Sequence, residues 1–397
     1  MASGAPNREP SRLSRGKKIL FAAAAVLLAL ALLELTARAI EIRRPPRTAD
    51  IGAGFLPGSR VFVASPGRPG WVETAAEKRL AFRTQEFEVP KARGTLRVFV
   101  LGGSSVNYLD DELAELEKQL WHTFEPRWSR VEVINVGGMS YGSARMVTIA
   151  SEVLGYDPDV VVLYEANNEF EELEQKELAS LGTVGLQRAL SLSAAVRLAQ
   201  DLVVAHEVDR LQRDQQARQE AAGATPARAR AWRHTFTQAE ADDRMRAFRD
   251  NYATIIDTYR ARGTPIVLAT VPSNLVRPAL RGPDLDAYAA VWTLLEQKRF
   301  AEADELGRKI LAACAGRHQS SDVENAIIRD LVRQRGVPMA DVEAVIRAAE
   351  PHHVPGETLF KDHCHLTAAG NRMLREALAA VVIDVLRAAA AVQPERR

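Results

Sequence analysis

The stretch "RVFVLGGSSVNY", Arg97 to Tyr108, runs five mostly apolar residues directly into two glycines and two serines. Short apolar runs rich in β-branched residues are typical of buried strands. Glycine permits a sharp turn that a side chain would block, so packing alone is one interpretation of this turn. The other interpretation is chemical, because a serine raised at a strand end lies beside unshielded backbone amides.

The same kind of apolar run recurs along the chain. The four predicted strands are "LRVFVL" (96–101), "VEVINV" (131–136), "DVVVLY" (159–164) and "PIVLATV" (265–271). Helical stretches such as "DDELAELEKQLWHTF" lie between them. Strands that alternate with helices predict a three-layer α/β/α domain with a mainly parallel, flavodoxin-like sheet. We expect this domain to span residues 95–390.

Two helix-prone segments interrupt the alternation. The first, at about 171–249, is charged and follows the third predicted strand. The second, at about 285–335, contains "VWTLLEQKRFAEADELGRKILAA", which resembles a single tetratricopeptide-like hairpin. One hairpin without neighbours cannot bury its own apolar face, so we expect it to pack on the main domain.

The N-terminus combines a basic segment, residues 1–18, with the apolar residues 19–40. A helix over 19–40 would be about 33 Å long, enough to cross the hydrocarbon core of a bilayer. We therefore expect a signal anchor, with the basic flank in the cytoplasm and the rest of the chain exported. A cleaved signal peptide ending at Ala39 is the alternative, which Glu34 and Arg38 beside the cleavage site disfavour.

Residues 41–94 are rich in Pro, Gly and Arg and are interpreted as a membrane-proximal lead-in rather than a packed domain. Within them, "FRTQEFEVP" alternates enough to form a short edge strand. The net charge of +1 gives no reason to expect a nucleic-acid partner. With only Cys314 and Cys364, the chain has no disulfide framework and at most one bridge.

Polar clusters follow three of the predicted strands, and a fourth lies near the C-terminus. In chain order they are "GGSS", "NVGGMSYGS", "EANNEF" and "FKDHCHLTAAGNRML". Ligands of open parallel sheets bind beyond the carboxyl ends of the strands, where the first three clusters lie. Each cluster is weak evidence alone, because short polar loops are usually turns or caps.

Together the clusters match an order of motifs, and the chain resembles the SGNH/GDSL hydrolase family. "LGGSS" stands at the Gly-Asp-Ser block, with Ser104 as the nucleophile and Gly103 in place of the usual aspartate. "ANNE" supplies Asn168 at the asparagine position, and "DHCH" supplies Asp362 and His365. The resemblance implies a serine esterase that uses these residues.

The resemblance covers roughly 95–380 outside the two helical segments and is strongest to a membrane-anchored bacterial branch. That branch has a third block like "YxGHNEF" and a later "TVPSNL" sequence, matched here by Thr270–Leu275. Asn167 stands where the branch tends to have histidine. The oxyanion position of the second block, often glycine, aligns best with Ser140, and Gly138 is the alternative.

The residue types suit these roles. A serine hydroxyl needs a neighbouring base, and neutral histidine serves near its ordinary pKa of roughly 6.5. Asp362 lies three residues before His365 and could orient its ring. The Ser104 amide, a second-block amide and the Asn168 side chain would stabilise the tetrahedral intermediate.

Other interpretations remain open at this point. Ser105 competes with Ser104 as a nucleophile on chemistry alone, and Asn168 could be a turn cap. A metal site is conceivable from His352, His353, His363, Cys364 and His365, but adjacent side chains point apart, so we expect no metal or other cofactor. Cys364 is better interpreted as a small buried residue. The residues that could line the pocket or simply pack are Tyr141, Arg145 and Asn274.

The sequence therefore predicts an extracytoplasmic, single-pass membrane protein that hydrolyses an acyl or acetyl ester of a small molecule or carbohydrate. A polysaccharide O-acetyltransferase with the same triad is one alternative, because water and a sugar hydroxyl can both meet an acyl-enzyme. A non-catalytic membrane-anchored binding module is the other. The sequence does not identify the substrate, because the insertions that would line the pocket carry no readable code.

Overall fold

The computed structural model describes residues 14–43, 60–79, 81–172, 192–199, 236–280 and 282–392. Its centre is a five-stranded parallel sheet with the order β5-β4-β6-β7-β8. The strands are β4 (Thr95–Gly102), β5 (Arg130–Gly137), β6 (Val160–Tyr164), β7 (Ile266–Ala269) and β8 (Met339–Ala340). The four predicted strands and the α/β class are confirmed. The two residues of β8 are too few to give a periodic signal.

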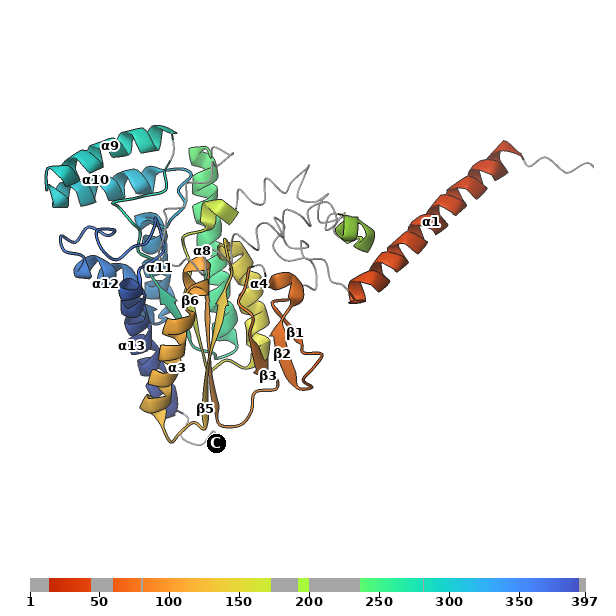
Figure 1. Cartoon of the computed structure of the whole chain (residues 1–397), viewed down its shortest axis with the longest axis horizontal. Coiled ribbons are helices and arrows are strands. Elements are labelled where there is room, and N and C mark those ends of the chain that lie inside the picture. Colours follow the sequence, from red (N-terminus) through yellow and green to blue (C-terminus); the bar gives the residue numbers. More distant parts are fainter. Residues whose placement is uncertain are drawn as a thin grey trace, which may run out of the picture.

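Helices cover both faces of this sheet (Figure 1). On one side lie α3 (Asp110–Phe124), α12 (Val342–Ala349) and α13 (Ala368–Val392). On the other lie α4 (Ser143–Val153), α8 (Gln238–Ala261) and α11 (Asp322–Arg335). The central strands are buried along their whole length, which explains why their sequences are apolar on both faces.

Strand order places a crevice beside β4. The chain leaves β4 toward β5 on one side and later returns to β6 on the other, so the connections diverge at the carboxyl end of β4. Such switch points are where open α/β sheets bind ligands. The "GGSS" turn follows β4 directly and leads into the short helix α2 (Ser104–Asn107).

The tetratricopeptide-like sequence forms a helical hairpin of α9 (Gly282–Glu296) and α10 (Phe300–Ala313). Tyr288 and Val291 of α9 meet Ala303 and Leu311 of α10 in a small apolar core of their own. That core also includes Val354, close to the predicted "DHCH" block. The hairpin therefore buries its face partly against the main domain, as expected for an isolated repeat.

The segment between the anchor and the main domain differs from the expectation of an unpacked lead-in. From Arg60 onward, it forms an antiparallel sheet of β1 (Phe62–Ala64), β2 (Trp71–Thr74) and β3 (Glu86–Glu88), with the 3-10 turn η1 (Ala76–Lys78) after β2. Phe62 and Phe87 pack edge-on against Tyr156, which belongs to the 3-10 turn η2 (Leu154–Tyr156). These aromatic contacts supply a core that the Pro- and Gly-rich composition did not reveal.

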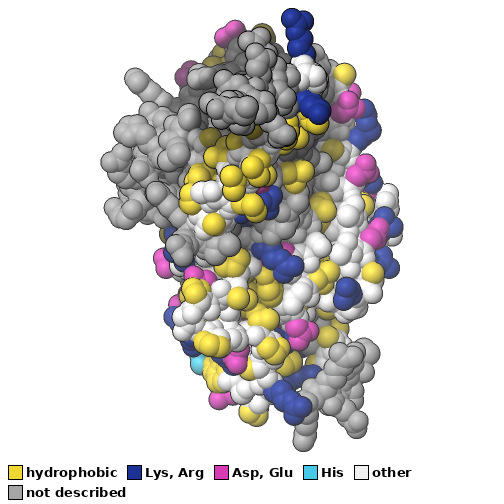
Figure 2. All heavy atoms as spheres, turned by 90° about the vertical axis from the view of Figure 1, so that its right-hand side faces the viewer, with side chains coloured by type: hydrophobic (Ala, Val, Ile, Leu, Met, Phe, Trp, Pro, Cys, Tyr) yellow, Lys and Arg dark blue, Asp and Glu magenta, His cyan; other side chains and the backbone are white. Residues whose placement is uncertain are grey.

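Helix α1 (Arg15–Arg43) projects away from the sheet domain (Figure 1). Its side chains from Ile19 to Leu35 are largely exposed to solvent, and it is long and apolar enough to cross a membrane. Figure 2 looks onto the side from which α1 projects, and hydrophobic side chains are visible there. Most of the predicted insertion at about 171–249 lies outside the described residues; residues 194–199 within it are helical, and its last part begins α8.

Candidate active site

Ser104 is the first residue of α2, immediately beyond the carboxyl end of β4. Gly103 precedes it with extended backbone angles, φ −85° and ψ −150°. The side chain of Ser104 is 7% exposed. Its N–H has no hydrogen-bond partner among the residues that the structure describes, as is usual for the first turn of a helix.

The structure brings Ser104, Asp362 and His365 together although 261 residues separate the serine from the histidine. Ser104 Oγ lies 2.8 Å from His365 Nε2, and His365 Nδ1 lies 2.7 Å from Asp362 Oδ2. Both distances are those of hydrogen bonds. The side chains of a serine, a histidine and an aspartate thus form one continuous hydrogen-bonded chain.

Asp362 is held rigidly in an ionised state. Its Oδ1 accepts hydrogen bonds from the backbone N–H groups of Cys364 and His365, at 2.9 and 2.8 Å. Burial raises the pKa of Asp362, but the hydrogen bond and charge of His365 outweigh it, so this pKa lies well below the ordinary value. A carboxylate in this state keeps the Nδ1 proton on His365, which leaves Nε2 free to accept one.

Asn168 reaches the same crevice from the loop after β6 and is 4% exposed. Its Nδ2 donates one hydrogen bond to the carbonyl of Tyr141, at 3.1 Å. A side-chain amide has two N–H donors, and within the described residues Nδ2 makes only this one hydrogen bond. Any side chain on Gly103 would collide with the amide of Asn168 and the carboxyl of Glu165. This close approach explains why glycine replaces the aspartate of the motif at position 103.

The second-block loop distinguishes between the two oxyanion candidates, Gly138 and Ser140. The N–H of Gly138 donates to the carbonyl of Gly102, and that of Met139 donates to the carbonyl of Ala81. Ser140 has φ +59°, a left-handed conformation that favours glycine. Its N–H has no hydrogen-bond partner in the described part of the chain. Of these two positions, Ser140 therefore offers the available amide.

A buried charge network, not anticipated from the sequence, joins the second and third blocks. Glu169 accepts from the N–H and hydroxyl of Ser143, the first residue of α4, at 2.6 and 2.9 Å. Glu172 accepts from the next two N–H groups of that helix. Arg244 of α8 pairs with both carboxylates. In the sequence, the only indication of this network is a run of acidic residues after "NN", which is equally typical of a solvent-exposed helix face.

Glu165 adds a third acid, which lies beside Gly103 of the "GGSS" turn. It is 2% exposed, and its carboxyl accepts a hydrogen bond from the N–H of Asn168 at 3.1 Å. Burial, followed by the charge of Glu169, raises the pKa of Glu165 well above its ordinary value. Glu165 and the network therefore fix the backbone around Asn168 without lining the crevice.

Asn167, which replaces the histidine of the related branch, connects two loops. Its Nδ2 donates to Ser105 Oγ at 3.1 Å, and its Oδ1 accepts from the N–H of Ser320 at 3.0 Å. Asn167 thereby links the loop after α10 to the "GGSS" turn. Ser105 hydrogen-bonds Asn167, while Ser104 hydrogen-bonds His365.

The sequence left open whether Tyr141, Arg145 and Asn274 line the pocket or pack in the fold, and the structure gives the contacts of each. Asn274 is fully buried and donates to the carbonyl of Asp362 at 2.7 Å, so it supports the acid's loop. Tyr141 packs edge-on against Phe82, and Arg145 lies over the Tyr141 ring. These contacts are packing and positioning contacts.

Four histidines near the C-terminus are candidate metal ligands by residue type: His352, His353, His363 and His365. His352 hydrogen-bonds Glu357 and stacks on Phe300, while His353 is exposed. Asp362, Cys364 and His365 do have ligand atoms within 4.8 Å of one another. However, Asp362 and His365 hydrogen-bond each other, and burial raises the pKa of the Cys364 thiol well above its ordinary value. This set therefore suits an acid–base pair better than a metal ion.

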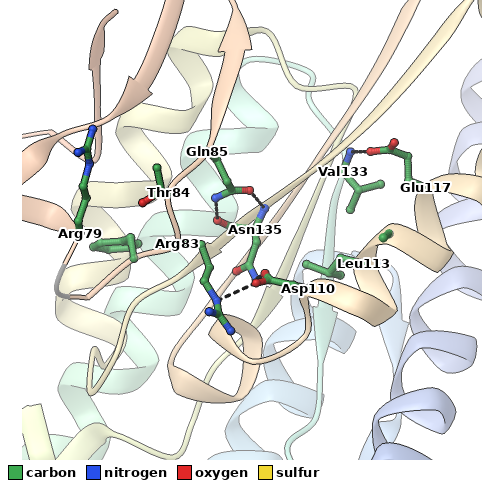
Figure 3. A pocket seen from close by; sticks show the side chains of 11 residues that line it. Arg79, Arg83, Thr84, Gln85, Asp110, Leu113, Glu117, Val133 and Asn135 are labelled. Atoms are coloured by element: carbon green, nitrogen blue, oxygen red, sulfur yellow. Dashed lines mark hydrogen bonds and ion pairs between the residues drawn. The ribbon is translucent and has the colours of Figure 1, made fainter. Parts of the chain in front are cut away.

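A cavity of about 550 Å³ lies beside the edge strand β5, away from the crevice. Figure 3 shows its polar lining paired internally: Gln85 bonds Asn135, and Arg83 pairs with Asp110. Glu117 accepts from the N–H of Val133. Side chains thus satisfy part of the outer edge of β5, which protects it from pairing with another chain.

Comparisons with known proteins give matches only among solved structures. No family model matches the chain, and no curated protein matches it. An acetyl xylan esterase is 14% identical, with a TM-score of 0.40, over 72% of this chain and 100% of its own. A GDSL-like lipase from Bacteroides thetaiotaomicron is 12% identical, with a TM-score of 0.35, over 76% and 92%. The chain is similar in fold to GDSL-like lipases and acetyl xylan esterases.

A catalytic mutant of an acetylxylan esterase from Geobacillus stearothermophilus also matches. It is 10% identical, with a TM-score of 0.38, and the match covers 72% of this chain and 94% of that one. At such identities the likeness concerns fold. Any activity has to be argued from the side chains of this chain.

Proposed function

We propose that the chain is a serine ester hydrolase in which Ser104 is the nucleophile, His365 the general base and Asp362 the orienting acid. The observation that carries the proposal is the 2.8 Å contact between Ser104 Oγ and His365 Nε2, continued by the 2.7 Å contact to Asp362. Serine is a weak nucleophile, and a base at hydrogen-bond distance is what activates it.

The reaction follows from this arrangement. Ser104 Oγ attacks the carbonyl carbon of an ester as its proton moves to His365 Nε2. The bond to the leaving alcohol then breaks, and the alcohol takes that proton. Water, deprotonated by His365, attacks the acyl-enzyme and releases the carboxylic acid and a free Ser104. Asp362 stabilises the imidazolium and takes no proton.

Three donors would hold the oxyanion: the Ser104 N–H, the Ser140 N–H and the second N–H of the Asn168 amide. The available amides at Ser104 and Ser140 support this assignment, and so does the single hydrogen bond that Asn168 Nδ2 makes within the described residues. Such preorganised donors act most strongly where the negative charge develops.

We expect Asn168→Ala to lower kcat by roughly 10²–10³-fold, the usual cost of removing one oxyanion donor. The melting temperature should fall only slightly, because Glu169 and Glu172, and not Asn168, accept the hydrogen bonds from the first N–H groups of α4. Ser140→Gly is the matched control: it retains the backbone N–H and suits a positive φ, so activity should persist. A large loss of stability with unchanged kcat would instead identify Asn168 as a structural cap.

An activated acetyl ester, supplied with and without a carbohydrate acceptor, tests the reaction class. Release of acetate in water alone is the result expected of the hydrolase. Acetylation that requires the acceptor would identify an O-acetyltransferase with the same triad. A folded protein that turns over neither substrate and never labels at Ser104 would favour a non-catalytic binding module.

We further propose that α1 anchors the protein in the cytoplasmic membrane of a bacterium, with the hydrolase domain on the outer side. The basic flank before α1, the exposed apolar helix and its sufficient length support this topology. A reporter fused to the C-terminus is therefore expected to be active only outside the cytoplasm. Reporter activity inside the cell would overturn the assignment.

A further inference from the structure

The last turns of α1 contact residues 192–199, a short piece of the predicted insertion. Glu34 accepts three hydrogen bonds from this piece: from Ser193 Oγ at 2.7 Å and from the N–H groups of Ala194 and Ala195 at 3.0 and 3.2 Å. One carboxylate thus satisfies several polar groups at the start of the 194–199 helix. The contact joins positions about 160 residues apart in the chain.

Two further pairs extend the contact along α1. Arg197 meets Glu41 through two guanidinium nitrogens, at 2.9 and 2.6 Å, and both side chains are only 15% exposed. Arg38 donates to the carbonyl of Leu192 at 3.3 Å and also pairs with Glu34. Two-point arginine–carboxylate pairs fix orientation as well as proximity.

Two small apolar side chains next to these pairs are buried. Ala37 is 2% exposed although the rest of α1 is largely open, and Ala194 is fully buried. Ala37 lies three residues after Glu34, on the same face of the helix. Buried alanines on both segments thus accompany the polar pairs between α1 and residues 192–199.

If α1 spans a bilayer, the carboxylate of Glu34 lies within the hydrocarbon core. About 20 residues cross a 30 Å hydrocarbon core, so a span that begins at Ile19 ends near Arg38. Glu34 then lies about one turn inside the outer boundary, where a carboxylate needs partners. Residues 193–195 supply them, while Leu192 remains 56% exposed and free to face lipid.

We propose that residues 192–199 are a membrane-interface element that docks on the outer end of α1 and makes this helix part of the mature protein. Cleavage after Ala39 would remove Glu34, Ala37 and Arg38, and with them most of the contact. The helix is therefore a retained anchor, and the inserted segment is held at the membrane surface. This inference rests on the proposed topology of α1 but not on the proposed esterase activity.

Cross-linking in membranes tests the contact with the full-length protein. We expect Ala37→Cys combined with Ala194→Cys to be joined efficiently by a short bis-maleimide. The native Cys314 and Cys364 are buried and should compete little. The control pair is Ala24→Cys with Ala194→Cys, because position 24 lies about 20 Å farther along the helix. Equal cross-linking of both pairs would contradict the proposal.

Charge exchange tests the arginine–carboxylate pair in the background of the first cysteine pair. Glu41→Arg and Arg197→Glu should each lower the cross-linked fraction several-fold, and the two together should restore it. No restoration, or recovery of a soluble mature chain that begins near Ile40, would overturn the inference. All these variants should hydrolyse a soluble ester like the parent protein, so failure of the docking and failure of the proposed chemistry are distinguishable.

Discussion

Ser104→Ala is expected to abolish covalent labelling by a serine-directed phosphonate and to lower ester turnover by roughly 10⁶-fold. The reason is that Ser104 Oγ is the group in contact with His365 Nε2, at 2.8 Å. His365→Ala should be about as damaging, because a nucleophile and its base act as one unit and their losses do not add. Labelling analysed by mass spectrometry and kcat on an activated acetyl ester provide the two measurements.

Ser105→Ala is the matched control for this result. Its hydroxyl contacts Asn167 rather than His365, so labelling and most of the activity should persist. Labelling that survives in Ser104→Ala and disappears in Ser105→Ala would reverse the assignment of the nucleophile. Full complementation of a deletion by Ser104→Ala in cells would show that the two glycines serve only the turn.

Asp362→Asn is expected to lower kcat by roughly 10⁴-fold while the fold is retained. The asparagine oxygen would be drawn to the two backbone N–H groups that Oδ1 now serves. Its NH₂ group would then face His365 Nδ1 and favour the tautomer protonated on Nε2. That tautomer cannot accept the Ser104 proton, so the loss arises mainly from the tautomer of His365.

Asp384→Asn, at an exposed position on α13, controls for the simple loss of one negative charge and should leave kcat unchanged. Melting temperature should be measured beside kcat, because the Asp362 loop also depends on Asn274. A decrease of less than tenfold with an intact fold would show that another group orients His365.

The sequence was sufficient for the sheet because the central strands are short, apolar on both faces and separated by helices. It missed β8, whose two residues carry no pattern, and the packing of residues 60–90. That packing depends on single aromatic residues, Phe62 and Phe87, meeting Tyr156 across the fold. Long-range contacts of this kind leave no local periodicity.

The candidate site residues were found from the order of the four motifs along the sequence. The structure brings Ser104 and Asp362 into hydrogen-bond contact with His365, and Asn168 bonds the carbonyl of Tyr141 in the second block. The choice between Gly138 and Ser140 could not be made from spacing, because it depends on which backbone amide is already bonded. The acids at positions 165, 169 and 172 were indistinguishable from a solvated face until their burial was known.

The small sheet of β1, β2 and β3 determines where a shortened form of this protein without α1 can start. Between η1 and β3, the carbonyl of Ala81 accepts a hydrogen bond from the N–H of Met139, and Phe82 packs on Tyr141. A truncation at Thr95, the boundary suggested by the motifs, would leave the loop that carries Ser140 without this support. A truncation that begins between the end of α1 and Arg60 would remove this helix and keep the residues that support the loop of Ser140.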